Sequence, residues 1–378
     1  MARTSEYYRG KRKKRNRILI PTAVFLGLLS LVVVLFYGMQ KYAVITKDSV
    51  RIESPLLAAS EDGESETAGE THAELEKTDA VIQFDEPDYS DVEARSVGSL
   101  GAVRAIFVSA DELYPEKIEE YADRLIVGNA LVLEMKPRTG ILKWDSKAWS
   151  ATAFSLAGDP LSDQMKALLA SLKQDKVYLV AQISICRDEL YASRSTVVAL
   201  RNDAGFNYMD EDGYWLDAYS LDLRDYTVSM ARELYAMGFD EVVLADVAHP
   251  VLPEDAPPLQ YTRDMSTPPS AVNAVCGFAL SVAEQLEDRE GKLSIYVDSS
   301  SALLGRDSEN GQDGNLFFKL YDRVYFMTDR YAYNFNVADL SNKPIKGNLS
   351  ERFVPVVYNY LPDNPDQVSW VLIDTENN

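Results

Sequence analysis

The chain has 378 residues, and 46% hydrophobic residues with 10% aromatic residues are enough apolar material for a large folded domain. Its formal net charge is −21 at pH 7, so no nucleic-acid partner is expected, because phosphate backbones bind to basic surfaces. Two cysteines and two histidines exclude a disulfide framework, a cysteine-based zinc site and a histidine-rich metal site, and no motif predicts a cofactor.

An apolar segment lies near the N-terminus. Residues 18–37 are uncharged and form a run of about 20 residues, long enough for a helix to cross a hydrocarbon core of roughly 30 Å. Basic residues are concentrated at positions 9–17, and acids dominate after the run. The positive-inside rule predicts a single-pass cell-membrane protein with a cytoplasmic tail (1–17) and an extracytoplasmic remainder. A cleaved signal peptide is the alternative, although no small-residue cleavage site follows the run.

The composition changes after the apolar run. Residues 42–99 are rich in Glu, Asp, Ser, Thr and Ala and have no sustained apolar periodicity. Such a segment cannot bury enough surface to offset the entropy of ordering the chain. We therefore predict a disordered acidic linker, with a short strand pattern only at residues 81–84.

From residue 101 to residue 378, short apolar runs alternate with helical patterns. Helices are predicted at 115–127, 161–172, 222–237 and 270–287. Strands are predicted at 103–108, 130–136, 177–185, within 238–250, and at 293–298, 323–327, 353–358 and 368–373. This alternation predicts an α/β fold, a (β/α)8 TIM-like barrel. An open doubly wound sheet is the alternative, but no glycine-rich phosphate loop follows any strand.

Polar side chains at the ends of the predicted strands are the candidate site, because TIM barrels place their active sites at that end. Glu134, Asp246 and Asp298 are the candidate catalytic carboxylates. Glycoside hydrolysis needs one carboxyl group that donates a proton and another that attacks or activates water. The candidate substrate-binding residues are Lys136, Arg187, Asp188, Trp215, Asp217, His249, Tyr325 and Tyr331.

These residues also have structural explanations. Asp246 could cap a helix or pair with an arginine of the barrel. Glu134 and Lys136 lie two positions apart on one strand and could pair with each other. Arg187 and Asp188 could form a local ion pair.

At these residues the chain resembles a family of glycosyl-hydrolase barrel domains of bacterial cell-surface proteins, which is distantly related to α-amylase-type barrels. The similarity starts near residue 103 and extends to the C-terminus. The segments that carry it are 130–136, 215–220 (Trp-Leu-Asp-Ala-Tyr-Ser), 238–241, 297–298 and 322–327. The resemblance implies a barrel that acts on cell-wall or surface polysaccharide, with Glu134 at the acidic position of the second strand.

The fourth strand departs from the family pattern Phe-Asp-Tyr-Val-Arg-Phe-Pro, whose Asp resembles the amylase-type nucleophile. An alignment without gaps puts Ala245 at this Asp and Asp246 at the Tyr. Because side chains alternate along a strand, either a bulge turns Asp246 inward or the usual nucleophile is absent. The first case predicts a hydrolase. The second predicts a catalytically inactive barrel that binds surface glycan or a cell-envelope protein.

Overall fold

The computed structural model describes residues 43–46, 49–52, 87–125, 128–262 and 269–374. The predicted cytoplasmic tail (1–17) and membrane helix (18–37) lie outside the described residues. Among the residues that are described, no helix is both long enough and apolar enough to cross a membrane.

The predicted linker carries structure where it is described. In the N-terminal unit, β1 (Ala43–Thr46) and β2 (Ser49–Ile52) pair as an antiparallel hairpin. Residues 87–99 belong to the same compact unit as the barrel, and Tyr89 and Val92 pack against its core. The prediction of a linker through residue 99 is therefore wrong at its C-terminal end. Tertiary contacts hold this segment, and its composition does not reveal them.

Eight parallel strands close into a barrel. They are β3 (Arg104–Val108), β4 (Ala130–Lys136), β5 (Tyr178–Ser184), β8 (Glu241–Ala245), β9 (Lys292–Val297), β10 (Val324–Met327), β11 (Phe353–Tyr358) and β12 (Trp370–Ile373). Each strand pairs with the next along the chain, and β12 pairs with β3. The TIM-like barrel predicted from the sequence is confirmed, and the open-sheet alternative is excluded.

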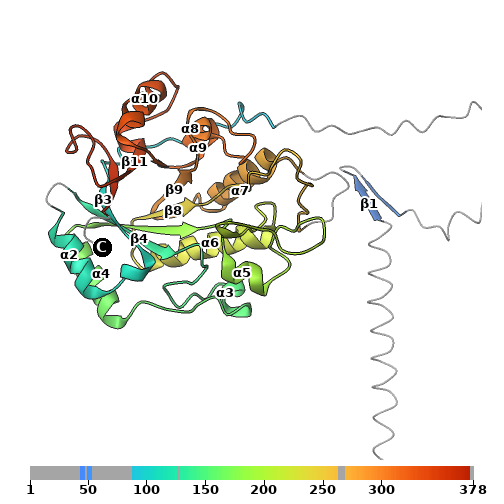
Figure 1. Ribbon diagram of the computed structural model, residues 1–378, viewed down its shortest axis with the longest axis horizontal. Helices are drawn as coiled ribbons and strands as arrows, with labels where there is room; N and C mark the ends of the chain where they lie inside the picture. Colours follow the sequence, from blue (N-terminus) through green and yellow to red (C-terminus); the bar gives the residue numbers. More distant parts are fainter. Residues whose placement is uncertain (1–42, 47–48, 53–86, 126–127, 263–268, 375–378) are drawn as a thin grey trace, which may run out of the picture. The chain divides into compact units, whose positions relative to one another are not determined.

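Helices lie around the outside of the strands (Figure 1). They are α2 (Pro115–Asp123), α3 (Trp149–Ala153), α4 (Asp163–Gln174), α5 (Glu189–Arg194), α6 (Leu221–Ala236), α7 (Ala271–Gln285), α8 (Ser300–Leu304), α9 (Gly314–Leu320), α10 (Arg330–Ser341) and α11 (Leu349–Arg352). The helices α4, α6 and α7 begin after Ser162, Ser220 and Ser270, whose hydroxyl oxygens accept a hydrogen bond from a first-turn N–H. A short 3-10 helix, η1 (Ala110–Glu112), follows β3, and a small hairpin of β6 (Met209–Asp210) and β7 (Gly213–Tyr214) precedes α6.

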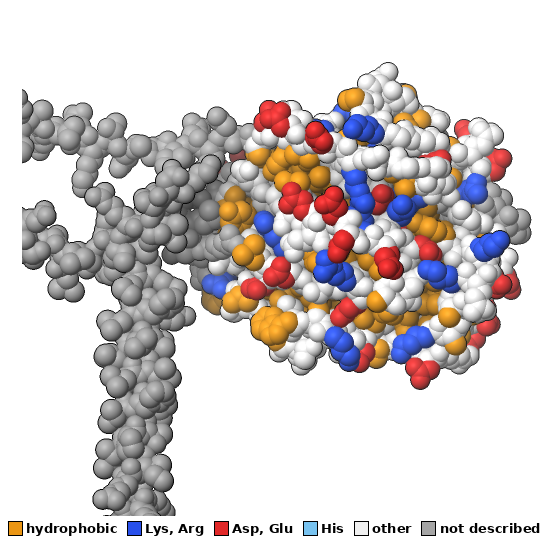
Figure 2. Space-filling view, turned by 180° about the vertical axis from the view of Figure 1, so that it is seen from behind, with side chains coloured by type: hydrophobic (Ala, Val, Ile, Leu, Met, Phe, Trp, Pro, Cys, Tyr) orange, Lys and Arg blue, Asp and Glu red, His pale blue; other side chains and the backbone are white. Residues whose placement is uncertain are grey.

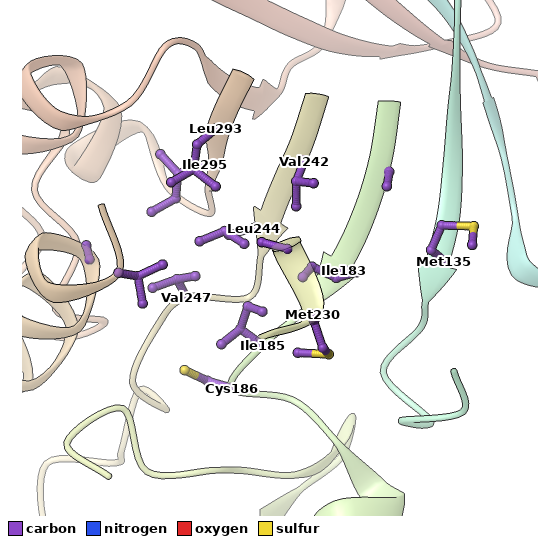
Figure 3. Close-up of a cluster of buried hydrophobic side chains, with 14 of the residues drawn as sticks. Met135, Ile183, Ile185, Cys186, Met230, Val242, Leu244, Val247, Leu293 and Ile295 are labelled. Carbon is purple, nitrogen blue, oxygen red and sulfur yellow. The ribbon is translucent and has the colours of Figure 1, made fainter. Parts of the chain in front are cut away.

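Side chains of the barrel strands alternate between two cores. Outward residues such as Val242 and Leu244 of β8 pack with Met230 of α6 in the layer between strands and helices (Figure 3). Inward residues such as Val243 form a second cluster inside the barrel, made mostly of valine and alanine. By this alternation Ala245, two residues after Val243, also faces inward.

The face shown in Figure 2 carries acidic and basic side chains interspersed among polar ones. It has no broad basic patch of the kind that a nucleic-acid backbone requires.

Candidate functional site

A cavity of about 740 Å³ opens at the C-terminal ends of the barrel strands. Every one of the eight strands contributes at least one lining side chain. Glu134 at the end of β4, Asp246 directly after β8 and Asp298 directly after β9 all line it. The barrel therefore brings the three candidate catalytic carboxylates into one cavity, although they are far apart in the sequence.

The backbone of Asp246 explains how its carboxylate reaches the cavity. Because Ala245 faces inward, Asp246 would face outward if β8 continued as a regular strand. Instead Asp246 has φ = 54°, in the left-handed region. Non-glycine residues enter this region at a cost on the order of 1–3 kcal/mol, and Asp tolerates it better than most. A change of backbone conformation at the strand end therefore turns the carboxylate inward. The two alternatives expected from the sequence were a bulge or the absence of the usual nucleophile.

Two side chains hold the Asp246 carboxylate. Arg138 donates to Oδ1 from Nη2 at 2.6 Å and from Nε at 3.1 Å, and the Ser184 hydroxyl donates to Oδ2 at 2.6 Å. Charge-assisted hydrogen bonds of this kind fix the orientation of a carboxylate strongly. The sequence interpretation missed Arg138. The only feature of the sequence that could have indicated a role in the site is its position two residues after the end of β4.

Asp298 lies on the inward face of β9 in line with Ser294 and Tyr296. Gln312 donates from Nε2 to its Oδ2 at 3.0 Å and accepts its backbone N–H at 2.8 Å. Burial, and then the negative charge of Asp246, raise the pKa of Asp298 to about 7. The Asp298 side chain itself is exposed to solvent in the open cavity, so the burial that raises its pKa comes from the surrounding cavity walls. Asp298 is thus a carboxyl group that can carry a proton near neutral pH.

Glu134 accepts a hydrogen bond from the backbone N–H of Ala110 at 2.9 Å. Burial raises the pKa of Glu134, and the charge of Asp246 adds to this effect. Lys136 forms its ion pair with Asp188, so the suggested pairing of Glu134 with Lys136 is wrong. A bulge in the pairing of β4 with β5 separates the two residues.

Arg187, Asp210 and Trp215 form a compact group at the cavity wall. Both terminal nitrogens of Arg187 donate to Asp210, at 2.9 and 2.8 Å, and Trp215 Nε1 donates to the same carboxylate at 2.7 Å. The guanidinium lies 4.0 Å from the centroid of the Trp215 ring, which is only 5% exposed. Trp215 lines the cavity but offers little open ring face for a substrate. Asp210, another residue that the sequence interpretation missed, holds the group together.

Lys136, Asp188 and Asp217 do not line the cavity. Lys136 Nζ lies 2.8 Å from Asp188 Oδ2, both side chains are essentially buried, and Asp188 caps α5 through the N–H of Tyr191. Asp217 is fully buried and accepts hydrogen bonds from the N–H and hydroxyl of Thr262, which anchors a loop. The substrate-binding prediction is therefore wrong for these three residues, because the fold turns each side chain into the protein to satisfy buried polar groups.

The other predicted binding residues have different positions. His249 lines the cavity, and burial lowers the pKa of its imidazole. Tyr325 also lines it, but its hydroxyl points toward the barrel interior and donates to Glu241 at 2.8 Å. Glu241 is paired there with Arg323 in a buried network. Tyr331 lies in α10, and its side chain is outside the described part of the structure.

Within the described ranges, no group of three or more His, Cys, Asp and Glu side chains is arranged to hold a metal ion. The two cysteines, Cys186 and Cys276, are buried free thiols.

The model of a family described as "Putative glycosyl hydrolase domain" matches residues 105–344, which contain five complete barrel strands, most of β3 and all three candidate catalytic carboxylates. No curated protein matches the chain.

Several solved structures are similar to this chain. The glycoside hydrolase domain of PgaB (BpsB) from Bordetella bronchiseptica is similar, with 14% identity, a TM-score of 0.48, and coverage of 72% of this chain and 94% of that chain. A hypothetical protein from Ruminiclostridium thermocellum has 17% identity, a TM-score of 0.43, and coverage of 50% of this chain and 96% of its own. A chitinase from Chromobacterium violaceum has 12% identity, a TM-score of 0.39 and coverage of 69% of each chain.

Proposed function

The chain belongs to the family described as "Putative glycosyl hydrolase domain", and we propose that it hydrolyses glycosidic bonds of a cell-wall or surface polysaccharide. The observation that carries this proposal is the presence of three carboxylates, from the ends of β4, β8 and β9, in one cavity. Glycoside hydrolysis uses a pair of carboxyl groups in different protonation states. The raised pKa of Asp298 and the arginine bound to Asp246 support such a pair of roles.

In this proposal Asp298 is the general acid. Its pKa of about 7 leaves a substantial protonated fraction near neutral pH, which a proton donor to the leaving oxygen requires. Asp246 is the partner carboxylate, which attacks the sugar or activates water and stabilises the positive charge that develops on it. Arg138 and Ser184 orient Asp246, and Glu134 adds negative charge at the same cavity.

We also propose that the barrel is extracytoplasmic and anchored by a single membrane helix at residues 18–37. The apolar run and the basic residues at positions 9–17 support this arrangement. The chain that follows residue 37 then connects the anchor to the barrel. In intact cells, an added protease should digest the barrel but leave the N-terminal tail intact.

The function is tested by the release of reducing ends from purified cell-wall glycans. We expect Asp298→Asn to lower kcat by about 10²–10⁴-fold, the usual contribution of general acid catalysis, and Asp246→Asn to cause a comparable loss. Asp288→Asn is a matched control, because the Asp288 side chain is 79% exposed and its recorded ion pair is with Arg232, away from the cavity. Activity that survives unchanged in both cavity variants would exclude the proposed mechanism.

A catalytically inactive glycan-binding barrel is the second candidate. It is favoured by Ala245, which takes the inward position of β8 where the family has its Asp. It is also favoured by Arg138, whose guanidinium is already paired with the Asp246 carboxylate. In that case the wild type releases no reducing ends, while it binds isolated wall material and Asp246→Asn weakens the binding. Retention of a cell-envelope protein without glycan would instead indicate a protein-binding barrel.

A further inference from the structure

The strand ends around the cavity fall into two contiguous halves. In barrel order, β4, β5, β8 and β9 are neighbours, and so are β10, β11, β12 and β3. The first group forms a polar arc, which consists of Glu134, Gln182, Ser184, Asp246 and Asp298. The second forms an apolar arc, which consists of Met327, Tyr358, Ile373 and Phe107. Each strand of the polar arc thus lies across the barrel from a strand of the apolar arc.

Tyr358 is the most exposed member of the apolar arc. It is the last residue of β11 and follows Val354 and Val356, which belong to the inner barrel cluster. The inward face of β11 therefore continues into Tyr358, yet this residue is 49% exposed where it lines the cavity. The next residue, Asn359, has φ = 53° and donates its backbone N–H to Ile373 at 3.1 Å. This bond ties the turn after Tyr358 to the neighbouring strand β12.

The other aromatic residues of the cavity present less open ring surface. Trp215 is 5% exposed and carries the Arg187 guanidinium against its ring. Tyr325 is 1% exposed and its hydroxyl is used by Glu241. The Tyr296 hydroxyl is buried. Tyr358 is therefore the cavity aromatic best placed to offer an accessible ring face.

A sugar in this cavity meets two different walls. Hydroxyl groups that faced the apolar arc would lose their hydrogen bonds with water, at a cost of about 1–3 kcal/mol for each unsatisfied group. A pyranose ring avoids this cost if its hydroxyl edge faces the polar arc and its C–H face lies against an aromatic ring. The order of the strands therefore determines how such a ring is oriented.

We propose that Tyr358 is a sugar-binding platform, on which the C–H face of a pyranose ring stacks opposite the carboxylates of the polar arc. The inference rests on the proposed glycan substrate and assigns a binding residue opposite the three carboxylates. Aromatic contacts of this type contribute about 0.5–1.5 kcal/mol beyond the buried area, which makes their loss measurable.

The test measures binding of two probes, the β-1,4-linked tetrasaccharides of glucose and of N-acetylglucosamine, to the full chain with Asp298→Asn, which prevents turnover. In this background we expect Tyr358→Ala to raise the Kd about 10-fold or more, which corresponds to about 1.4 kcal/mol. Tyr358→Phe keeps the ring and should bind within about threefold of the parent, given the size of such contacts. Tyr114→Ala is the matched control, because Tyr114 is 47% exposed but does not line the cavity.

Proton NMR gives a second readout. Stacked C–H protons of the bound sugar should shift upfield with Tyr358 or Phe at position 358, and this shift should vanish in Tyr358→Ala. Unchanged binding in Tyr358→Ala overturns the inference. So does a Tyr358→Phe variant as weak as Tyr358→Ala, or a parent chain that binds neither probe.

The outcomes also separate this inference from the proposed function. If Asp298 is needed for hydrolysis but Tyr358→Ala leaves binding unchanged, the inference fails and the function stands. If the wild type hydrolyses no glycan but binds the probes in a Tyr358-dependent way, the platform stands and the barrel is a binder.

Discussion

At the scale of single residues, the chemistry depends on how the surroundings of similar carboxylates differ. Asp246 has a guanidinium and a hydroxyl within hydrogen-bonding distance, whereas Asp298 has the neutral amide of Gln312. Burial and the charge of Asp246 raise the pKa of Asp298, so this carboxyl group keeps its proton more easily than a free one. The two residues therefore suit different roles in one reaction.

The pKa of Asp298 leads to a prediction of pH dependence. Because the pKa of Asp298 is raised to about 7, the residue is fully protonated well below pH 7. It loses this proton as the pH rises through about 7. If Asp298 is the general acid, kcat/KM should fall about tenfold per pH unit above that value. Hydrolysis rates measured at low substrate concentration between pH 5 and pH 9 test this.

The residual activity of Asp298→Asn provides the control for this pH profile. It should show no decrease near pH 7, because the amide does not titrate. The same decrease in the variant as in the wild type would assign the titration to another group.

At the scale of elements, the loop after β4 is built around a buried ion pair. Lys136 Nζ contacts Asp188 Oδ2 at 2.8 Å and the carbonyl oxygen of Ser184 at 2.5 Å. Gly140, with φ = 82°, approaches the same carboxylate so closely that a Cβ atom would lie 1.9 Å from Asp188 Oδ1. The pair thus packs against the loop that also carries Arg138, so it supports the site without contacting a ligand.

This pair predicts a large effect on stability. Lys136→Met should lower the free energy of unfolding by about 3–5 kcal/mol, because it leaves the Asp188 carboxylate buried without its partner. Adding Asp188→Asn should recover much of the loss, since Asn can still cap α5. Urea unfolding of the two variants and the wild type measures both effects.

Lys147→Met is the control for the buried pair. Lys147 pairs with Asp145, and both side chains are more than two-thirds exposed, at 77% and 69%. Such pairs contribute about 0–1 kcal/mol. A Lys136→Met variant no less stable than Lys147→Met would contradict a structural role for the buried pair.

At the scale of the whole barrel unit, the segment before β3 closes over the N-terminal end of the barrel. Glu351 accepts the N–H groups of Leu100 and Gly101 at 2.8 and 3.1 Å, and Arg323 Nη2 donates to their carbonyl oxygens at 3.1 and 3.0 Å. Lys319 Nζ donates to the carbonyl oxygen of Tyr89 at 2.9 Å. These bonds join residues more than 200 positions apart.

A chain that starts at residue 87 should therefore be more stable than one that starts at residue 102. The shorter chain leaves the Arg323 and Glu351 groups without these partners, and we expect a loss of about 2–5 kcal/mol, given about 1–3 kcal/mol for each unsatisfied buried group. Urea unfolding midpoints of the two chains, followed by tryptophan fluorescence, measure the difference. Equal midpoints would show that residues 87–101 do not belong to the cooperative unit.

The local pattern of apolar residues was sufficient to predict most of the strands and helices of the barrel. The sequence predicted eight strands and four of the longer helices, although α2 ends at Asp123 where a helix through 127 was expected, and α4 covers 163–174 where 161–172 was expected. Apolar periodicity is a property of neighbouring residues, so it survives without knowledge of the fold. The same alternation places Glu134 and Asp298 on inward faces, which is why both could be named from strand ends.

Pairings between distant residues could not be predicted in this way. Arg138 with Asp246 and Lys136 with Asp188 exist only because strand closure brings separate loops together. The left-handed conformation of Asp246 and the arginine against Trp215 are likewise consequences of packing.

The sequence by itself therefore determined the barrel, its family and the strand ends at which carboxylates occur, because these follow from periodicity and local motifs. Only the tertiary structure decided which of those side chains enter the cavity and which are used inside the protein. That outcome depends on the distances and burial that arise when the eight strands close.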